Sequence, residues 1–377
     1  MKKNDLKEAV ERDKVESKKS ISRQNFLKVM GSVIMTGGVA GASIPFITGK
    51  GKKATPPKTK STILPTGKIV KRVAADPTNI PAPIHRSHAI THDITLEAKE
   101  VTAEIEPGVT FKYMTWNGQI PGPMIRIRQG DTVNVTLKNS TNRAHNVDMH
   151  AVYGTGGGNM ATLVVPGGES HMRFKAMYPG AFIYHCAVPN MDYHISSGMF
   201  GMIVVEPPEG LPKVDHEFYL GQNEIYTNKK AGQKGHHEFD FNNMLKEDPS
   251  YVVLNGEKHA LTPSVHGAMK TKTGETARIF LVNGGPNLTS SFHPIGNIFT
   301  KAWRAGAIIN NPDRYVQTMH VPPGSTGVFE LEFPVPETIK LVDHALTRVV
   351  RKGMLGEIAV SGKKRPDIFD PNPTKNA

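Results

Sequence analysis

The chain of 377 residues contains a single cysteine, Cys186, and few aromatic residues, which make up 7% of the sequence. One cysteine excludes a disulfide framework within the chain, so this thiol needs another explanation. No long amphipathic helical pattern is present, and only the stretch near 236–247 favours a short helix. The 36 glycines and 28 prolines are typical of turn-rich β structure. We therefore expect an all-β protein.

Beyond residue 72 the chain carries no excess charge of either sign. The formal net charge of +12 comes from residues 1–72, which hold 17 basic and 5 acidic residues, whereas the remainder holds 29 of each. A nucleic-acid-binding surface needs a basic patch on the folded part of a protein. We therefore expect no nucleic-acid partner.

The first 48 residues resemble an export leader that lacks one residue of the usual signal. Residues 1–28 are polar and lysine-rich, and residues 29–48 carry no charge and include Ala40-Gly41-Ala42, an A-x-A pattern suited to signal cleavage. The junction SRQNFLK resembles the twin-arginine signal, but Gln24 replaces its second arginine. We expect a periplasmic or other extracytoplasmic location. The alternative is an uncleaved membrane anchor, because the apolar segment is near the minimum spanning length.

The rest of the chain is weakly duplicated. Four motifs recur in the same order at offsets of 138 to 157 residues: WNG and LNG, GDTV and GETA, PGG and PGS, GMFGMIVV and GMLGEIAV. Runs such as TVNVTL and ARIFLV predict strands, so two tandem Greek-key β-sandwich domains of the cupredoxin type are expected. We place a Lys/Pro-rich linker at 49–84, the domains at 85–207 and 208–362, and a C-terminal tail at 363–377.

The cysteine lies in HCAVPNMDYHISSGM, residues 185–199. A thiolate, two imidazoles and a weak axial thioether form the blue-copper electron-transfer site. The loop C-x7-H-x4-M offers Cys186, His194 and Met199, and His145 in AHNVDMH is the natural fourth ligand. The alternative is that Cys186 is a buried small apolar residue beside incidental histidines.

Two more histidines stand at odd spacings from these residues. His185 directly precedes Cys186, and His150 follows His145 by five residues. Since side chains alternate faces along a strand, His150 and His185 should lie together on the outer face when Cys186 and His145 face the interior. Such a pair is half of a second metal site, although both could instead be solvated surface histidines. His344 in LVDHALTR is the candidate third ligand.

The motifs HNVDMH, YHCAVPNMDYHISSGM, SSFHPIG and LVDHAL resemble those of the copper-containing nitrite reductases, over roughly residues 85–362. The resemblance implies one-electron reduction of nitrite to nitric oxide at a type 2 copper that a type 1 copper supplies with electrons. It implies type 1 ligands His145, Cys186, His194 and Met199, and type 2 ligands His150, His185 and, from a neighbouring subunit of a homotrimer, His344. It implies proton-handling roles for Asp148 and His293, a pocket-capping role for Ile295, and a small cytochrome c or blue-copper protein as electron donor.

Two other functions fit part of the pattern. A laccase-like two-domain oxidase needs several H-x-H motifs and a His-Cys-His sequence, whereas Ala187 follows Cys186 here. An electron carrier or copper-storage protein would need neither the second domain nor His344. Copper content separates them, at one per chain for a carrier, two for a reductase and four for an oxidase. The trio His85, His88 and His92 could load metal or be incidental.

Overall fold

The computed structural model describes residues 72–373, so the expected leader and most of the expected linker lie outside the described residues. Within this part the chain forms twenty strands in four sheets. Its α-helices are the short α3 (Met191–Ser196) and α4 (Phe241–Leu245). The all-β class is confirmed, and α4 is the short helix expected near 236–247. None of the described helices has the length and hydropathy that a membrane crossing needs.

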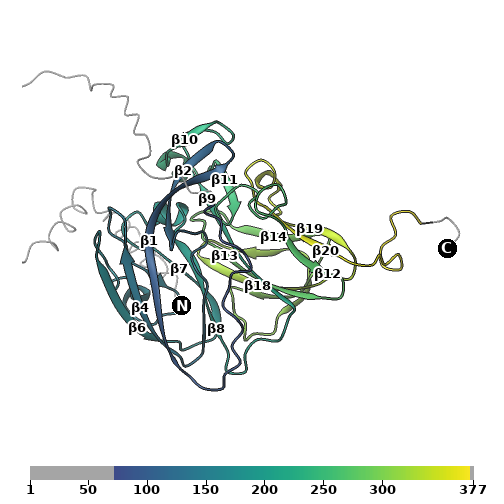
Figure 1. The fold of residues 1–377 in the computed structure, drawn as a ribbon, viewed down its shortest axis with the longest axis horizontal. Coiled ribbons are helices and arrows are strands. Elements are labelled where there is room, and N and C mark those ends of the chain that lie inside the picture. The colour runs from purple at the N-terminus through teal and green to yellow at the C-terminus, as the bar shows by residue number, and fades with distance from the viewer. Residues whose placement is uncertain (1–71, 374–377) are drawn as a thin grey trace, which may run out of the picture. The chain divides into compact units, whose positions relative to one another are not determined.

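The first half of the chain is a sandwich of two sheets (Figure 1). One sheet has the order β10-β2-β1-β4-β6, with β2 (Val109–Trp116), β1 (Thr91–Glu106), β4 (Thr132–Asn139) and β6 (Glu169–Lys175). Its edge strand β10 (Gly235–His237) comes from the second half of the chain. The other has the order β3-β8-β7-β5, with β3 (Ile125–Arg128), β8 (Phe200–Glu206), β7 (Gly180–His185) and β5 (Asp148–Met149). Val133, Val135 and Leu137 alternate with polar residues along β4 and are buried, so the two-residue period sets the inner face.

The second half repeats this arrangement. One sheet has the order β11-β9-β13-β18-β15-β16, with β11 (Tyr251–Leu254), β9 (His216–Ile225), β13 (Thr276–Asn283), β18 (Ser325–Glu332), β15 (Phe299–Arg304) and β16 (Asp313–Val316). The other has the order β12-β20-β19-β14-β17, with β12 (Met269–Lys272), β20 (Leu355–Ser361), β19 (Glu337–Asp343), β14 (Ser290–Ile295) and β17 (Met319–Val321). Strand β9 runs parallel to β13 as β1 does to β4, which agrees with the expected duplication.

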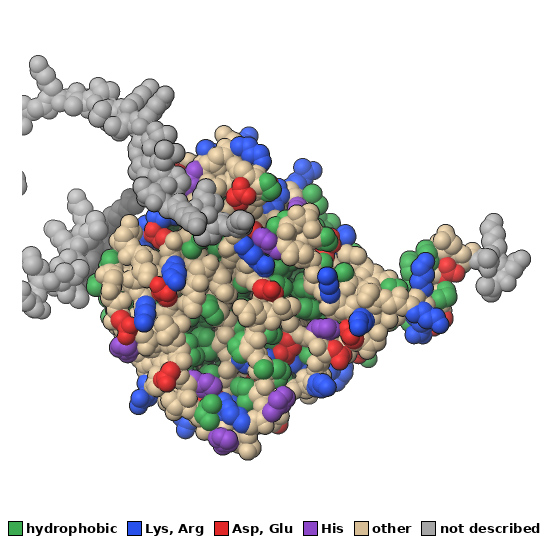
Figure 2. All heavy atoms as spheres, in the orientation of Figure 1, with side chains coloured by type: hydrophobic (Ala, Val, Ile, Leu, Met, Phe, Trp, Pro, Cys, Tyr) green, Lys and Arg blue, Asp and Glu red, His purple; other side chains and the backbone are tan. Residues whose placement is uncertain are grey.

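Three apolar clusters fill the two halves and the junction between them. One lies within the first half and contains Cys186, and a second consists of residues of the second half together with Ala74. The third joins residues of both halves, among them Ile183 of β7 and Val328 of β18. The face of β7 that points away from Cys186 is therefore partly covered by the second half. Acidic and basic side chains are interspersed on the face shown in Figure 2, as expected from their equal numbers.

The end of the expected linker 49–84 is part of the fold. The N–H groups of Val73 and Ala74 donate to Glu257 Oε1 at 2.6 and 2.9 Å, and the N–H of Ala75 donates to the carbonyl of Ile120 at 2.8 Å. Hydrogen bonds to the rest of the fold therefore begin at residue 73, before the expected domain boundary at residue 85. Three small apolar residues have no periodicity, and the acceptor of Val73 lies 184 residues away in sequence, so a local pattern could not predict this contact.

Candidate metal centres

Cys186, His145 and His194 converge in the core of the first half. The Cys186 Sγ lies 3.6 Å from His145 Nδ1 and 3.4 Å from His194 Nδ1, and the three ligand atoms lie within 4.8 Å of one another. Met199 is fully buried beside them. Its carbonyl accepts the N–H of Cys186 at 3.1 Å, and its own N–H donates to the carbonyl of His194 at 3.1 Å. These four residues are the predicted type 1 set.

This group is buried, which sets the protonation of its side chains. Burial, with His194 next to it, lowers the pKa of His145 to about 3. Burial and the nearby Arg143 lower the pKa of His194 to about 4, and burial raises the pKa of the Cys186 thiol. Both imidazoles are therefore neutral at pH 7 and carry the lone pair that a metal requires. His145 Nε2 lies 2.9 Å from Thr141 Oγ1, which orients the ring with Nδ1 toward the sulfur.

His150 and His185 meet on the other face of the same strands, as the odd spacings predict. Asp148 of β5 pairs with His185 at the end of β7. The Nε2 atoms of His150 and His185 lie 3.1 Å apart, and the ligand atoms of the two histidines and Asp148 all lie within 4.8 Å. His150 is exposed, but only 8% of His185 is exposed. His185 is therefore not a solvated surface histidine.

Hydrogen bonds determine which nitrogens face each other. His185 Nδ1 lies 3.0 Å from the carbonyl oxygen of Cys186, so the Nδ1–H donates there and Nε2 keeps its lone pair. Burial, with His185 beside it, lowers the pKa of His150. Two imidazoles that present Nε2 to each other are suited to share a cation.

A second histidine pair lies on the surface of the second half. His293 of β14 and His344, which follows β19, have ring centroids 5.2 Å apart. His293 Nδ1 lies 2.5 Å from the carbonyl of Gln317, so the Nδ1–H donates to it and Nε2 is left for other partners. Ile295 lies two residues further along β14, on the same face as His293, and is 42% exposed.

The two histidine pairs do not meet within one chain. Among residues 72–373, the groups of three or more candidate metal ligands are His145–Cys186–His194 and Asp148–His150–His185. Neither group contains His293 or His344. The trio His85, His88 and His92 forms no such group either, and His92 Nε2 instead lies 2.9 Å from Asp131 Oδ2.

The sequence did not predict three residues that hold these groups in place. Besides Thr141, Asn146 Oδ1 accepts the N–H of Ala187 at 2.8 Å, next to the cysteine. Gly157 adopts a positive φ of 57°, and a Cβ there would overlap the Asp148 carboxylate. The sequence could have indicated two of them, because Asn146 lies inside the HNVDMH motif and Gly157 lies inside a run of three glycines.

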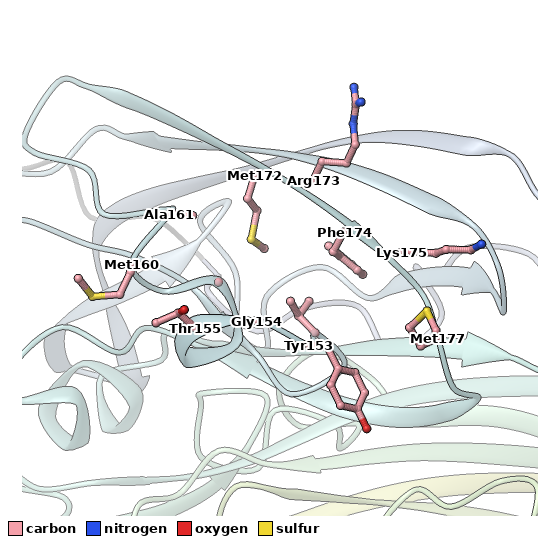
Figure 3. A pocket seen from close by; sticks show the side chains of 12 residues that line it. Tyr153, Gly154, Thr155, Met160, Ala161, Met172, Arg173, Phe174, Lys175 and Met177 are labelled. Atoms are coloured by element: carbon pink, nitrogen blue, oxygen red, sulfur yellow. The ribbon is translucent and has the colours of Figure 1, made fainter.

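Two apolar hollows flank Tyr153, next to His150. One, of about 520 Å³, is lined by His150, Tyr153, Tyr178 and Ile309 among others. The other, of about 710 Å³, lies between Tyr153 and the strand that carries Met172 and Phe174 (Figure 3). Tyr153 is 77% exposed, so a large apolar surface adjoins the outer histidine pair.

The donor set fits copper. A buried thiolate with two imidazoles and a thioether suits blue copper, and a pair of imidazoles suits a second copper, zinc, iron or nickel. The residues present thus fit a type 1 copper in the core of the first half and part of a second metal site on its outer face.

Comparisons with known proteins agree with this chemistry. A family model described as multicopper oxidase matches residues 97–210. A copper-containing nitrite reductase of Neisseria meningitidis is 43% identical over 303 residues, which cover 80% of this chain and 78% of that protein. Among solved structures, the copper nitrite reductase of Nitrosomonas europaea superimposes with a TM-score of 0.64 at 31% identity, covering 74% of this chain and 96% of that chain. The copper-containing nitrite reductase of Thermus scotoductus has a TM-score of 0.63 at 30% identity, covering 73% and 63%. The chain therefore belongs to the copper-containing nitrite reductases.

Proposed function

We propose that this chain reduces nitrite to nitric oxide by one electron, at a type 2 copper that receives its electron from a type 1 copper. The type 1 ligands are His145, Cys186, His194 and Met199. The type 2 ligands are His150 and His185 of one subunit and His344 of a neighbouring subunit. The observation that carries this proposal is that consecutive residues, His185 and Cys186, belong to two different ligand groups.

Copper in these sites supplies reversible one-electron transfer and a Lewis acid that binds and polarises the nitrite anion. The reaction NO2⁻ + e⁻ + 2H⁺ → NO + H2O also needs two protons at the departing oxygen. Asp148 lies with His150 and His185 in one group, so its carboxyl group can deliver a proton there. His293 has its Nδ1–H committed to Gln317, which leaves Nε2 to carry the other proton. Each such group contributes about 10²–10⁴-fold in rate.

The assembly we propose is a homotrimer with head-to-tail contacts. Apolar side chains are exposed next to both histidine pairs: Tyr153 lines a hollow together with His150, and Leu346 lies two residues after His344. These are two different surfaces of one chain, so a contact between them is heterologous and can close into a ring. Such a contact would bring His344 of one subunit to His150 and His185 of the next. Ile295 would then cover the nitrite site.

Electrons would enter near His194. Tyr193 contacts His194 with ring centroids 5.7 Å apart and Phe241 of α4 with centroids 5.2 Å apart. Phe241 is 46% exposed and Leu245 is 79% exposed. This exposed apolar surface suits transient docking of a small cytochrome c or blue-copper protein. The uncharged segment 29–48 supports export to the periplasm or another extracytoplasmic space, with membrane attachment only if that leader is retained.

The shared site can be tested by subunit complementation. His150→Ala and His344→Ala homotrimers should each lack nitrite reduction, because every type 2 site is missing one ligand. Co-expression with two different tags, followed by tandem purification, yields mixed trimers. In these, some interfaces pair an intact His150 with an intact His344, so activity should reappear. Mixed trimers that stay inactive while holding type 1 copper would refute the shared site.

A further inference from the structure

The second half keeps the backbone pairing that surrounds the cysteine of the first half. In the first half, the register of β7 with β8, continued by one residue, sets Cys186 opposite Met199, and the N–H of Cys186 donates to the carbonyl of Met199 at 3.1 Å. Strands β19 and β20 have the corresponding antiparallel register, and its continuation by one residue sets Asp343 opposite Met354. By its place in the strand pairing, Asp343 therefore corresponds to Cys186.

A second backbone bond identifies the counterpart of His194. The N–H of Met199 donates to the carbonyl of His194 at 3.1 Å, and the N–H of Met354 donates to the carbonyl of Arg348 at 3.0 Å. Arg348 therefore occupies the place of His194. An acid and a base stand in the second half where the first half has a thiol and an imidazole.

Asp343 and Arg348 form an ion pair that ties two strands together. Asp343 is fully buried, and its Oδ2 lies 2.6 Å from Arg348 Nη1. Its Oδ1 accepts the N–H groups of Ser291 and Ala345, each at 3.0 Å. Arg348 Nη1 also donates to the carbonyl of Thr289 at 2.8 Å. Apart from the bond within the pair, every side-chain hydrogen bond of these two residues thus goes to β14, to the residue that precedes β14, or to Ala345 beside His344.

His344 lies between Asp343 and Ala345, and the N–H of Ala345 donates to the Asp343 carboxylate across it. Its own N–H donates to the carbonyl of Ser291 at 2.7 Å. Ser291 belongs to β14, the strand that also carries His293. The backbone of His344 is consequently fixed on both sides relative to His293, while its ring remains on the surface.

We propose that the Asp343–Arg348 ion pair positions His344 for the type 2 copper of a neighbouring subunit, and that it stands where the first half binds its own copper. This inference rests on the proposed function, which makes His344 a ligand. Partners that orient a metal ligand typically change metal affinity about 10-fold to 100-fold when they are removed. An ion pair with a buried carboxylate thus stands in the second half where the first half has the proposed type 1 ligands, and it serves the proposed type 2 site.

The test is a copper titration of type 2-depleted trimers that retain type 1 copper, followed by the type 2 signal in electron paramagnetic resonance. Arg348→Met should raise the Kd for type 2 copper about 10-fold to 100-fold. Arg348→Lys should restore most of the affinity, because an ammonium group can still pair with Asp343. Arg304→Met is the matched control: it removes the exposed Arg304–Asp313 ion pair of the same half and should leave the Kd unchanged. The type 1 absorption reports that the first half is folded.

His344→Ala, titrated in parallel, separates the two claims, that His344 is a type 2 ligand and that the Asp343–Arg348 ion pair positions it. Loss of type 2 binding in His344→Ala with a wild-type Kd in Arg348→Met would overturn the positioning role and leave the ligand assignment intact. Wild-type binding in His344→Ala would overturn the assignment and, with it, this inference. If Arg348→Met does not assemble, Asp343→Asn takes its place: it keeps an oxygen for the two N–H donors, removes the charge, and should show the same rise in Kd.

Discussion

His185 and Cys186 are consecutive residues whose side chains lie on opposite faces of one strand end. The Cys186 Sγ lies 3.4 Å from His194 Nδ1, whereas His185 Nε2 lies 3.1 Å from His150 Nε2. One peptide joins the two ligand groups, and the His185 Nδ1–H bond to the Cys186 carbonyl, at 3.0 Å, is a second link. The proposed coppers would therefore be connected by a short bonded path for the electron.

Replacing His150 should separate the two sites. His150→Ala removes one outer ligand and leaves the buried group of Cys186 untouched. We expect full type 1 absorption, loss of the type 2 resonance and loss of nitrite reduction, measured on the same copper-loaded sample. Nitric oxide production at wild-type rates by this variant would refute the type 2 assignment.

Asp148 should be needed for turnover but not for copper binding. Asp148→Asn keeps the size of the side chain and removes the acidic proton, so copper content should stay at two per chain. Turnover should fall by about 10²–10⁴-fold, the usual contribution of a positioned general acid. Steady-state rates across pH, together with metal analysis, test this. Unchanged rates with both coppers present would exclude the proton role.

Gly157 should act through Asp148. In Gly157→Ala a Cβ would overlap the Asp148 carboxylate, so that the carboxylate must move. We expect slower turnover with normal type 1 absorption. Gly167→Ala is the matched control, because Gly167 also has a positive φ, of 73°, but no atom lies within 4 Å of the added Cβ. Equal losses in both variants would mean that backbone strain alone is responsible.

Asp131 should stabilise the fold in a pH-dependent way. Burial favours the neutral acid, but hydrogen bonds from Arg86, from the N–H groups of Arg128 and Ile90, and from His92 outweigh it and hold the pKa of Asp131 well below its ordinary value. A carboxyl group whose pKa is lower in the folded state stabilises the fold above its unfolded pKa of about 4, and this stabilisation is lost as the pH falls below that value.

Asp131→Asn should consequently lower the free energy of unfolding by about 3 kcal/mol at pH 7, as expected when one partner of a buried ion pair is removed. The difference from wild type should shrink as the pH falls below about 4. Urea unfolding at a series of pH values measures it. A difference that stays constant from pH 7 to pH 3 would show that the charge of Asp131 is not responsible.

The sequence predicted the fold class and the two groups of side chains that converge in the first half, because these depend on local order. The strand period places His185 and Cys186 on opposite faces, and the spacing of Cys186, His194 and Met199 is typical of a blue-copper loop. The ion pair of Asp343 and Arg348 could not be predicted this way. Two charged residues five positions apart normally indicate solvated side chains, and only the register of β19 with β20 reveals that Asp343 corresponds to Cys186.

The proposed contact between subunits could not be predicted from the sequence either. Tyr153 follows His150 and Leu346 follows His344 closely in sequence, but only the fold shows that both apolar side chains are exposed. The held segment 73–75 depends likewise on a distant acceptor, Glu257. Long-range pairing of this kind decides assembly and domain boundaries, and it leaves no periodic trace in the chain.

The most direct measurement is nitric oxide release from nitrite, without oxygen, by copper-loaded protein supplied with a chemical reductant. We predict release at enzymatic rates that is abolished when the type 2 copper is selectively removed and restored when copper is returned. Intense type 1 absorption without nitric oxide release, at two coppers per chain, would contradict nitrite reduction and favour an electron carrier.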